Sequence, residues 1–175
     1  IISMVRAQIE VPLAVKLSQH ITGLSSFARR AEDAGANGLV LFNRFYGAEV
    51  DLDALAMTSR LALSNPEELR FPLRWIGILR AQRPGLSLAA TTGVHSGLDA
   101  VKALLVGADV ACTTSAVLQH GTGWVGRMLA ELGTWLTDHD YDSVRQLQGS
   151  MSADNVSDPA AFERAQYMKV ITSQI

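Results

Sequence analysis

The 175-residue sequence has one cysteine and no long apolar run, and neither positive nor negative residues are in large excess. A single cysteine excludes a framework of intrachain disulfides and a cysteine-rich metal site, and it is typical of a reducing compartment, so we expect a cytoplasmic protein. The net charge is -2 with both signs interspersed, so no basic stripe marks a nucleic-acid partner. The four histidines lack the spacing of metal ligands, and we expect no metal site.

Membrane and secretion signals are also missing from the sequence. No apolar run approaches the roughly 20 residues that a helix needs to cross a bilayer, so we expect no membrane partner. The first residues, IISMVRAQIEVP, lack the basic start, the apolar region and the cleavage site of a signal peptide. They also lack an initiator methionine, and we expect the chain to begin inside a domain.

Strand-like and helical segments alternate along the chain. We expect strands at 11–18, 37–44, 86–91 and 109–115, and helices at 24–36, 69–82, 96–109 and 122–139. Ser96 with Asp99 three residues later predicts a capped helix start, and Asp158 before a proline predicts a short helix in a helical tail from about residue 140. Residues 45–68 are irregular, and long connections of this kind often carry function.

Repeated βα units with short connections predict an α/β fold with a parallel sheet. Hydrophobic residues make up 48% of the sequence, which fits a sheet that is buried. Only four units are visible, whereas a closed (β/α)₈ barrel needs eight units and about 250 residues. The sequence therefore predicts half of such a barrel or a small open sheet.

Polar residues follow the expected strands at their carboxyl ends, where sites form in both α/β architectures. Lys16 lies within a strand. It is either a cation held against an anionic ligand or a strand-tip lysine with its head in water. Asn43 ends an apolar strand. Its amide either caps the following turn or faces a planar ligand.

Two turns close consecutive strands and lead directly into helices: TTGVHSG at 91–97 and ACTTSA at 111–116. Backbone N–H groups at a glycine turn and at a helix start can bind an anion, and the last two loops of a barrel commonly hold phosphate. The pair of turns therefore predicts a phosphate site. His95 is the one histidine kept as a candidate beside it, whereas Cys112 is expected to be buried and structural.

The order of VPLAVKLS, AGANGLVLFNR, LAATTGV and GADVACTTSAVLQHG resembles the C-terminal half of class 1 dihydroorotate dehydrogenases. The resemblance covers nearly the whole chain, including a segment at 140–151. Members of that family are TIM barrels that hold FMN at the carboxyl ends of their strands. The resemblance therefore implies that residues 1–175 supply the last four βα units of one FMN-binding barrel domain, with the missing N-terminal half as partner and a homodimer left open.

Four residues in the first half of the chain receive roles from the resemblance. Lys16 corresponds to the family's flavin-contacting lysine, and Asn43 to the asparagine that reaches the substrate over the flavin ring. The backbone of Phe42 would lie close to the flavin, and Ser64 falls near another flavin-contacting turn. The resemblance thus assigns Lys16 and Asn43 to catalysis, and Asn43 also to substrate binding. It assigns Lys16, Phe42 and Ser64 to the cofactor.

The phosphate turns receive the remaining roles. Thr92 and Gly93 fall on the family's Gly-Gly turn, and Thr114 and Ser115 fall on its Gly-Thr turn. Thr92 and Thr114 stand in place of glycines, and each adds a Cβ atom where the family allows close backbone approach. Arg44 stands where a small polar residue is usual, so the identity of the substrate stays open.

The resemblance implies an FMN-dependent dehydrogenase that oxidises dihydroorotate or a related CH–CH substrate, as in pyrimidine biosynthesis. It places the catalytic base upstream of residue 1, so we expect the chain alone to be inactive. Two alternatives stay open. One is a barrel that binds flavin or a phosphate ligand without catalysis, and the other is an aldolase-type barrel that uses Lys16 as a Schiff-base amine.

Overall fold

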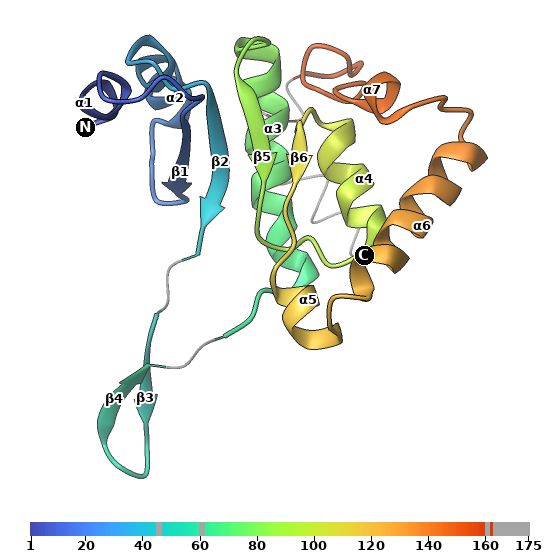
Figure 1. The fold of residues 1–175 in the computed structure, drawn as a ribbon. Helices are drawn as coiled ribbons and strands as arrows, with labels where there is room; N and C mark the ends of the chain where they lie inside the picture. The colour runs from blue at the N-terminus through green and yellow to red at the C-terminus, as the bar shows by residue number, and fades with distance from the viewer. Residues whose placement is uncertain (45–46, 60–61, 160–161, 163–175) are drawn as a thin grey trace.

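The computed structural model describes residues 1–44, 47–59, 62–159 and 162, and a parallel sheet lies at its centre (Figure 1). The strand order is β1-β2-β5-β6. The strands are β1 (Ala14–Ser18), β2 (Gly38–Asn43), β5 (Ser87–Ala90) and β6 (Val110–Ala111). In the register of the sheet, Ala14 lies opposite Gly38, and Gly38 lies opposite Ser87. The expected α/β fold with a parallel sheet is therefore confirmed.

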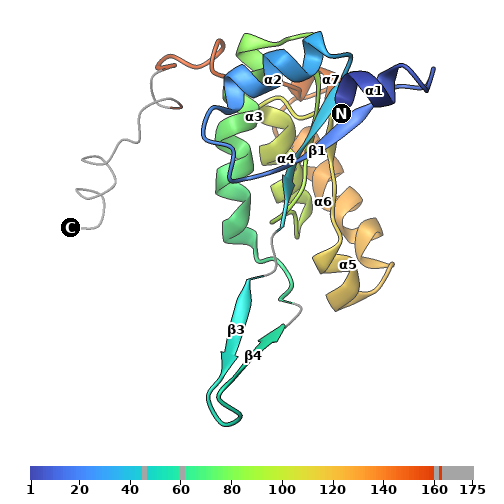
Figure 2. The same cartoon turned by 90° about the vertical axis from the view of Figure 1, so that its left-hand side faces the viewer.

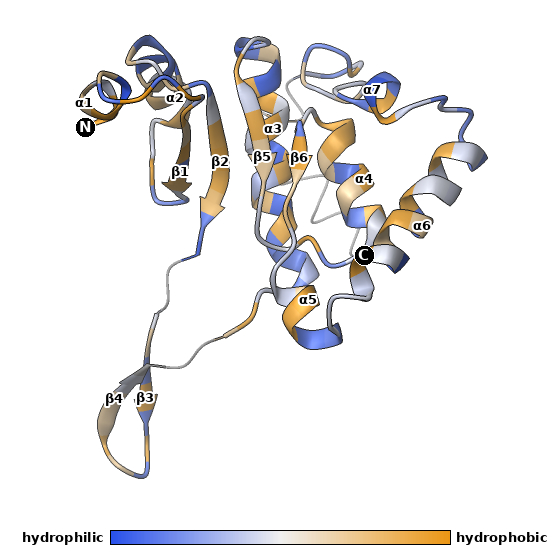
Figure 3. Ribbon diagram, viewed as in Figure 1, coloured by the Kyte–Doolittle hydropathy of each residue, from blue (hydrophilic) through white to orange (hydrophobic). Residues whose placement is uncertain are grey.

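The helices lie in the same alternation with the strands that the sequence predicts. They are α2 (Leu24–Asp33), α3 (Arg70–Gln82), α4 (Gly97–Leu105) and α6 (Trp124–Asp138). Helix α3 contacts β2 and β5, and α4 packs against β6 and α6. Figure 3 shows apolar residues along β2 and, interrupted by polar ones, along α4. Leu41 of β2 and Ala103 of α4 both lie in the main core. Burial of these apolar faces drives the assembly of the layers.

Only one face of β1 is covered by helices. Leu17 is buried in the main core together with Leu41 and Leu88, whereas Ala14 and Lys16 on the opposite face of β1 are exposed. The sequence-based expectation of a fully buried strand at 11–18 is therefore wrong. The strand is shorter, and it lies at an edge of the sheet with one open face.

The expected strand at 109–115 is also shorter in the structure. Only β6 pairs with β5, and the N–H of Cys112 then donates to the carbonyl of Ala90 at 2.8 Å. The chain leaves the sheet there and enters a short helix, α5 (Ser115–His120). This early exit brings Thr114 and Ser115 to the helix start at the carboxyl end of the sheet.

The irregular connection at 45–68 contains an antiparallel hairpin, β3 (Ala48–Asp51) and β4 (Ala56–Ser59), followed by the 3-10 helix η1 (Pro66–Leu69). Figure 2 shows the hairpin extending away from the sheet and helices. Its large apolar side chains are exposed, and Leu55 at the turn is 85% exposed. The hairpin therefore adds little to the core and begins beyond the carboxyl end of β2.

The ends of the chain are short helical pieces. Helix α1 (Ile2–Arg6) precedes β1, and α7 (Val144–Leu147) follows α6. The tail after α7 returns to α4, because Gly149 and Met151 donate backbone N–H groups to the carbonyls of Leu104 and Leu105. The helix expected after Asp158 falls mostly on residues outside the described part of the chain.

Candidate functional site

A cavity of about 530 Å³ lies at the carboxyl end of the sheet. Residues of β1 and β2 and of the segments that follow β2, β4, β5 and β6 contribute to its wall. Every residue to which the resemblance assigns a role lines it: Lys16, Phe42, Asn43, Ser64, Thr92, Gly93, Thr114 and Ser115. The volume falls within the range of about 300–1,000 Å³ that is usual for small-molecule sites.

Lys16 brings a cation to this cavity. Its side chain projects from the open face of β1, and it makes no hydrogen bond or ion pair with any residue that the structure describes. An ammonium group in such a position is available to an anionic or electron-rich ligand. The side chain lies within the strand rather than at its tip, and it is exposed.

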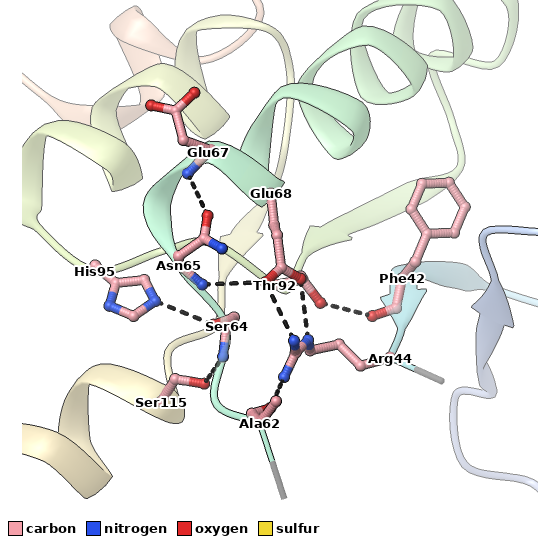
Figure 4. Close-up of polar contacts among 10 residues, drawn as sticks. All are labelled: Phe42, Arg44, Ala62, Ser64, Asn65, Glu67, Glu68, Thr92, His95 and Ser115. Atoms are coloured by element: carbon pink, nitrogen blue, oxygen red, sulfur yellow. Dashed lines mark hydrogen bonds and ion pairs between the residues drawn. The ribbon is translucent and has the colours of Figure 1, made fainter. Parts of the chain in front are cut away.

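Asn43 and Phe42 end β2 and contribute in different ways. Within the described ranges the amide of Asn43 makes no hydrogen bond, and the residue lines the cavity. Phe42 is 3% exposed, and its ring packs against Phe71 with ring centroids 5.2 Å apart. Its carbonyl accepts a hydrogen bond from the hydroxyl of Thr92 at 3.2 Å (Figure 4). Phe42 therefore holds the turn after β5 through its backbone.

The turn after β5 has two consecutive residues in the left-handed region. The φ angle is 77° at Thr92 and 81° at Gly93. A Cβ atom at residue 93 would lie 2.3 Å from the backbone nitrogen of Leu69. Glycine is therefore required at 93 by its backbone conformation and by the close approach of η1. Thr92 keeps the backbone shape of a glycine turn although it carries a β-branched side chain.

Ser64 connects three segments of the site. Its backbone N–H donates to Ser115 Oγ at 2.9 Å, and its own Oγ lies 3.0 Å from His95 Nε2 (Figure 4). The residue is 7% exposed, and it lines the cavity. Ser64, in the segment after the hairpin, thus links the turn after β5 to the turn after β6. Thr114 stands before α5 with an exposed side chain that caps no helix N–H.

Arg44 and Glu68 form a contact that the sequence interpretation missed. The guanidinium donates from Nε and Nη2 to the two carboxylate oxygens at 3.0 and 3.1 Å, and Nη1 donates to the carbonyl of Ala62. Glu68 also accepts the backbone N–H of Asn65 at 3.1 Å. Asn65 followed by proline, with Glu68 three residues after Asn65, is the spacing of a capping box, so the sequence signals the Asn65–Glu68 contact but not the pairing with Arg44.

The start of α4 is held by the capping box expected from Ser96 and Asp99. Asp99 Oδ2 accepts the backbone N–H groups of His95 and Ser96 at 3.2 and 3.1 Å, and Lys102 Nζ lies 3.0 Å from Oδ1. Burial raises the pKa of Asp99, and the hydrogen bonds from Lys102, Ser96 and the His95 backbone lower it more. The pKa therefore lies below its ordinary value of 3.8. The carboxylate is charged at neutral pH and fixes the turn beside the site.

Cys112 differs from its expected place. It is half-buried and lines the cavity, because β6 ends before it and the chain turns away from the sheet. Over the ranges that the structure describes, no cluster of three or more histidine, cysteine, aspartate or glutamate residues is arranged to hold a metal ion. Within the same ranges, no helix has the length and apolar character needed to span a membrane.

The chemistry of the cavity is that of a donor-rich site for a polar, anionic ligand. Lys16 offers an ammonium group and Asn43 an amide, and neither has a described protein partner. Ser64, Thr114 and Ser115 contribute hydroxyls to the part of the cavity wall that the turns after β5 and β6 form. A ligand with a phosphate at one end and a ring system near Lys16 and Asn43 fits this distribution.

No family model matches the sequence. The chain is 30% identical over 156 residues to the catalytic subunit of dihydroorotate dehydrogenase B (NAD(+)) from Citrifermentans bemidjiense, which covers 86% of this chain and 50% of that protein. It is 33% identical over 110 residues to dihydroorotate dehydrogenase A (fumarate) from Limosilactobacillus reuteri, covering 61% of this chain and 35% of that protein. The chain thus spans about half the length of the curated relatives that match 86% of its residues. The resemblance seen in the sequence is confirmed, and the chain is dihydroorotate dehydrogenase-like over most of its residues.

Proposed function

We propose that the chain forms part of an FMN-dependent oxidoreductase that oxidises dihydroorotate or a related CH–CH substrate, as dihydroorotate dehydrogenases do. The observation that carries the proposal is the convergence of residues from five separate segments on one cavity. These are the residues that the resemblance assigns to the flavin and the substrate, although they lie far apart in the sequence.

The distribution of donors suggests how FMN would be held. Ser64, Thr92, Thr114 and Ser115 would hold the phosphate, and Lys16 would stabilise negative charge on the ring. Bound flavin supplies the hydride acceptor of the reaction. Asn43 would orient the substrate through its amide. The resemblance places the proton-abstracting base upstream of these residues, so the chain by itself would be inactive.

The open sides of the sheet support a larger barrel of which this chain supplies the last four βα units. The exposed face of β1 carries Lys16, and the edge strand β6 exposes Val110. A hollow of about 420 Å³ beside β1 is lined mostly by apolar side chains, including Ile2, Val15 and Phe27. Preceding βα units of a (β/α)₈ barrel would cover these surfaces.

The visible absorption spectrum of the complete protein that contains these residues is the direct test. We expect a flavin spectrum, release of FMN on denaturation, and bleaching when dihydroorotate is added without oxygen. A colourless protein that gains no flavin on incubation with FMN would contradict the proposal. If flavin is bound but dihydroorotate does not bleach it, the protein either oxidises a related substrate or binds flavin without catalysis.

A Schiff-base aldolase is the second candidate, because Lys16 is an amine in a cavity that pairs with none of the residues the structure describes. Treatment of the complete protein with borohydride and a carbonyl substrate would then trap a covalent adduct on Lys16. Mass spectrometry of the peptide that contains Lys16 would detect it. An adduct in a protein without flavin would favour the aldolase over the oxidoreductase.

A further inference from the structure

His95 stands behind the cavity rather than in its wall. Its Nε2 atom lies 3.0 Å from Ser64 Oγ, and Ser64 is the residue of this pair that lines the cavity. The two residues are brought together from different segments, because Ser64 precedes η1 and His95 follows β5. Figure 4 shows the imidazole pointing at the Ser64 side chain.

The backbone of His95 is held on both sides. Its N–H donates to Asp99 Oδ2 at 3.2 Å, and its carbonyl accepts the indole N–H of Trp124 at 2.8 Å. The Trp124 ring in turn contacts the His120 ring, with centroids 4.2 Å apart and the ring planes tilted by 31°. The backbone of His95 is therefore fixed by hydrogen bonds to α4 and α6, and its imidazole extends from there toward Ser64.

The direction of the hydrogen bond decides what Ser64 can offer to a ligand. If the serine donates to Nε2, its only proton is used and its lone pairs remain, which disfavours an anion in the cavity. If Nε2–H donates to the serine, the hydroxyl proton is free to point into the cavity. Ser115 Oγ already accepts the backbone N–H of Ser64 at 2.9 Å, so its own proton is likewise left over.

We propose that His95 is a positioning residue that donates Nε2–H to Ser64 Oγ and so turns the Ser64 hydroxyl proton toward the phosphate group of the ligand. This inference rests on the proposed function, in which that ligand is FMN. The phosphate would accept hydrogen bonds from both serine hydroxyls, and its charge would select the Nε2–H tautomer of His95. Of the His95–Ser64 pair, only Ser64 would touch the phosphate, and His95 would act through it.

The test compares FMN with riboflavin, which has the same ring system but no phosphate. The complete protein is freed of flavin, and the Kd of each flavin is measured from the quenching of its fluorescence. The variants are His95→Leu, which removes the donor, and His95→Gln, which keeps an N–H near the position of Nε2. A Ser64→Ala variant and the Ser64→Ala, His95→Leu double variant complete the set.

We expect His95→Leu to weaken FMN binding about tenfold and riboflavin binding less than about twofold, since one hydrogen bond to a charged group is lost. We expect His95→Gln to restore most of the affinity for FMN. The double variant should bind FMN no more weakly than Ser64→Ala, because both changes remove the same interaction.

Four results would overturn the inference in distinguishable ways. Equal losses for the two flavins in His95→Leu would show that His95 only supports the fold, and an unchanged FMN affinity would show that it does not act on the phosphate. Wild-type protein that binds both flavins equally would refute the phosphate site while leaving flavin binding intact. Wild-type protein that binds neither flavin would refute the proposed function, and the inference with it.

Discussion

Arg44 and Glu68 are joined by two parallel hydrogen bonds, with Nε–Oε2 and Nη2–Oε1 distances of 3.0 and 3.1 Å, across the two ends of the segment that carries the β3–β4 hairpin. Arg44 lies directly after β2, and Glu68 lies in η1. The ion pair therefore closes the neck of the hairpin beside the cavity. It also places the Glu68 carboxylate against the guanidinium that follows Asn43, so the pair carries no net charge beside the cavity.

Substitution Glu68→Gln should lower the free energy of unfolding by about 1 kcal/mol, because a bidentate ion pair that is only about a third exposed is replaced by a single neutral hydrogen bond. Urea denaturation measures the change. Glu67→Gln is the matched control, since Glu67 pairs with Arg70 at a largely exposed position and should change stability little. Equal effects of the two substitutions would contradict the role given to Glu68.

Substitution of the two residues of the left-handed turn should change the free energy of unfolding by very different amounts. Gly93→Ala should destabilise the protein by more than about 2 kcal/mol, because the new Cβ would meet the Leu69 backbone. Thr92→Gly should change stability by less than about 1 kcal/mol, since relief of the strained φ offsets the lost hydrogen bond to Phe42 and the greater freedom of the unfolded chain.

Gly85→Ala is the control for both turn variants, because a Cβ at residue 85 would meet nothing within 4 Å and its φ lies outside the left-handed region. Thermal unfolding of the three variants gives the comparison. A well-tolerated Gly93→Ala variant would show that η1 moves away readily from this turn.

Asp99 makes stability depend on acid pH. Its pKa is lower in the folded state than the ordinary value of 3.8, so its contribution is complete well above that value and is lost as pH falls through the folded pKa. Asp99→Asn should cost about 1–2 kcal/mol at neutral pH and should flatten the loss of stability below about pH 4. Urea denaturation at a series of pH values measures both effects.

Asp154→Asn is the control for the acid experiment, because Asp154 is exposed and its side chain has no partner within the described ranges. It should leave the acid limb of the stability curve unchanged. An Asp99→Asn variant with the same acid limb as the wild type would rule out the linkage.

Lys16→Met should weaken flavin binding or slow flavin reduction in the complete protein by about tenfold or more, because a single charge-assisted contact to the ring is lost. It should leave the melting temperature nearly unchanged, since Lys16 is exposed and unpaired within the part of the chain that the structure describes. Lys16→Arg keeps the charge and should retain part of the activity. Flavin binding and reduction that are indifferent to both changes would refute the role of Lys16.

The strands and long helices were predictable because their apolar periodicity is local, and the capping box at Ser96 was read directly from its spacing. The convergence of Asn43, Thr92 and Ser115 on one cavity follows from the rule that parallel strands share a carboxyl end, whereas Ser64 follows the antiparallel hairpin and was indicated by the resemblance alone. The Ser64–His95 contact and the Arg44–Glu68 pair were not predictable in this way. They join residues of different segments, and their distances depend on how η1 and the hairpin neck pack against the turn after β5.

The position of the hairpin has a consequence for how the sheet can fold. Each strand of the sheet pairs with the next sheet strand along the chain, and the hairpin is inserted between β2 and β5. The separation of β2 and β5 in the sequence is about twice that of β1 and β2, and such a doubling costs only about 0.6 kcal/mol in chain closure. The βα units can therefore assemble one after another while the hairpin varies in length and sequence with little effect on folding.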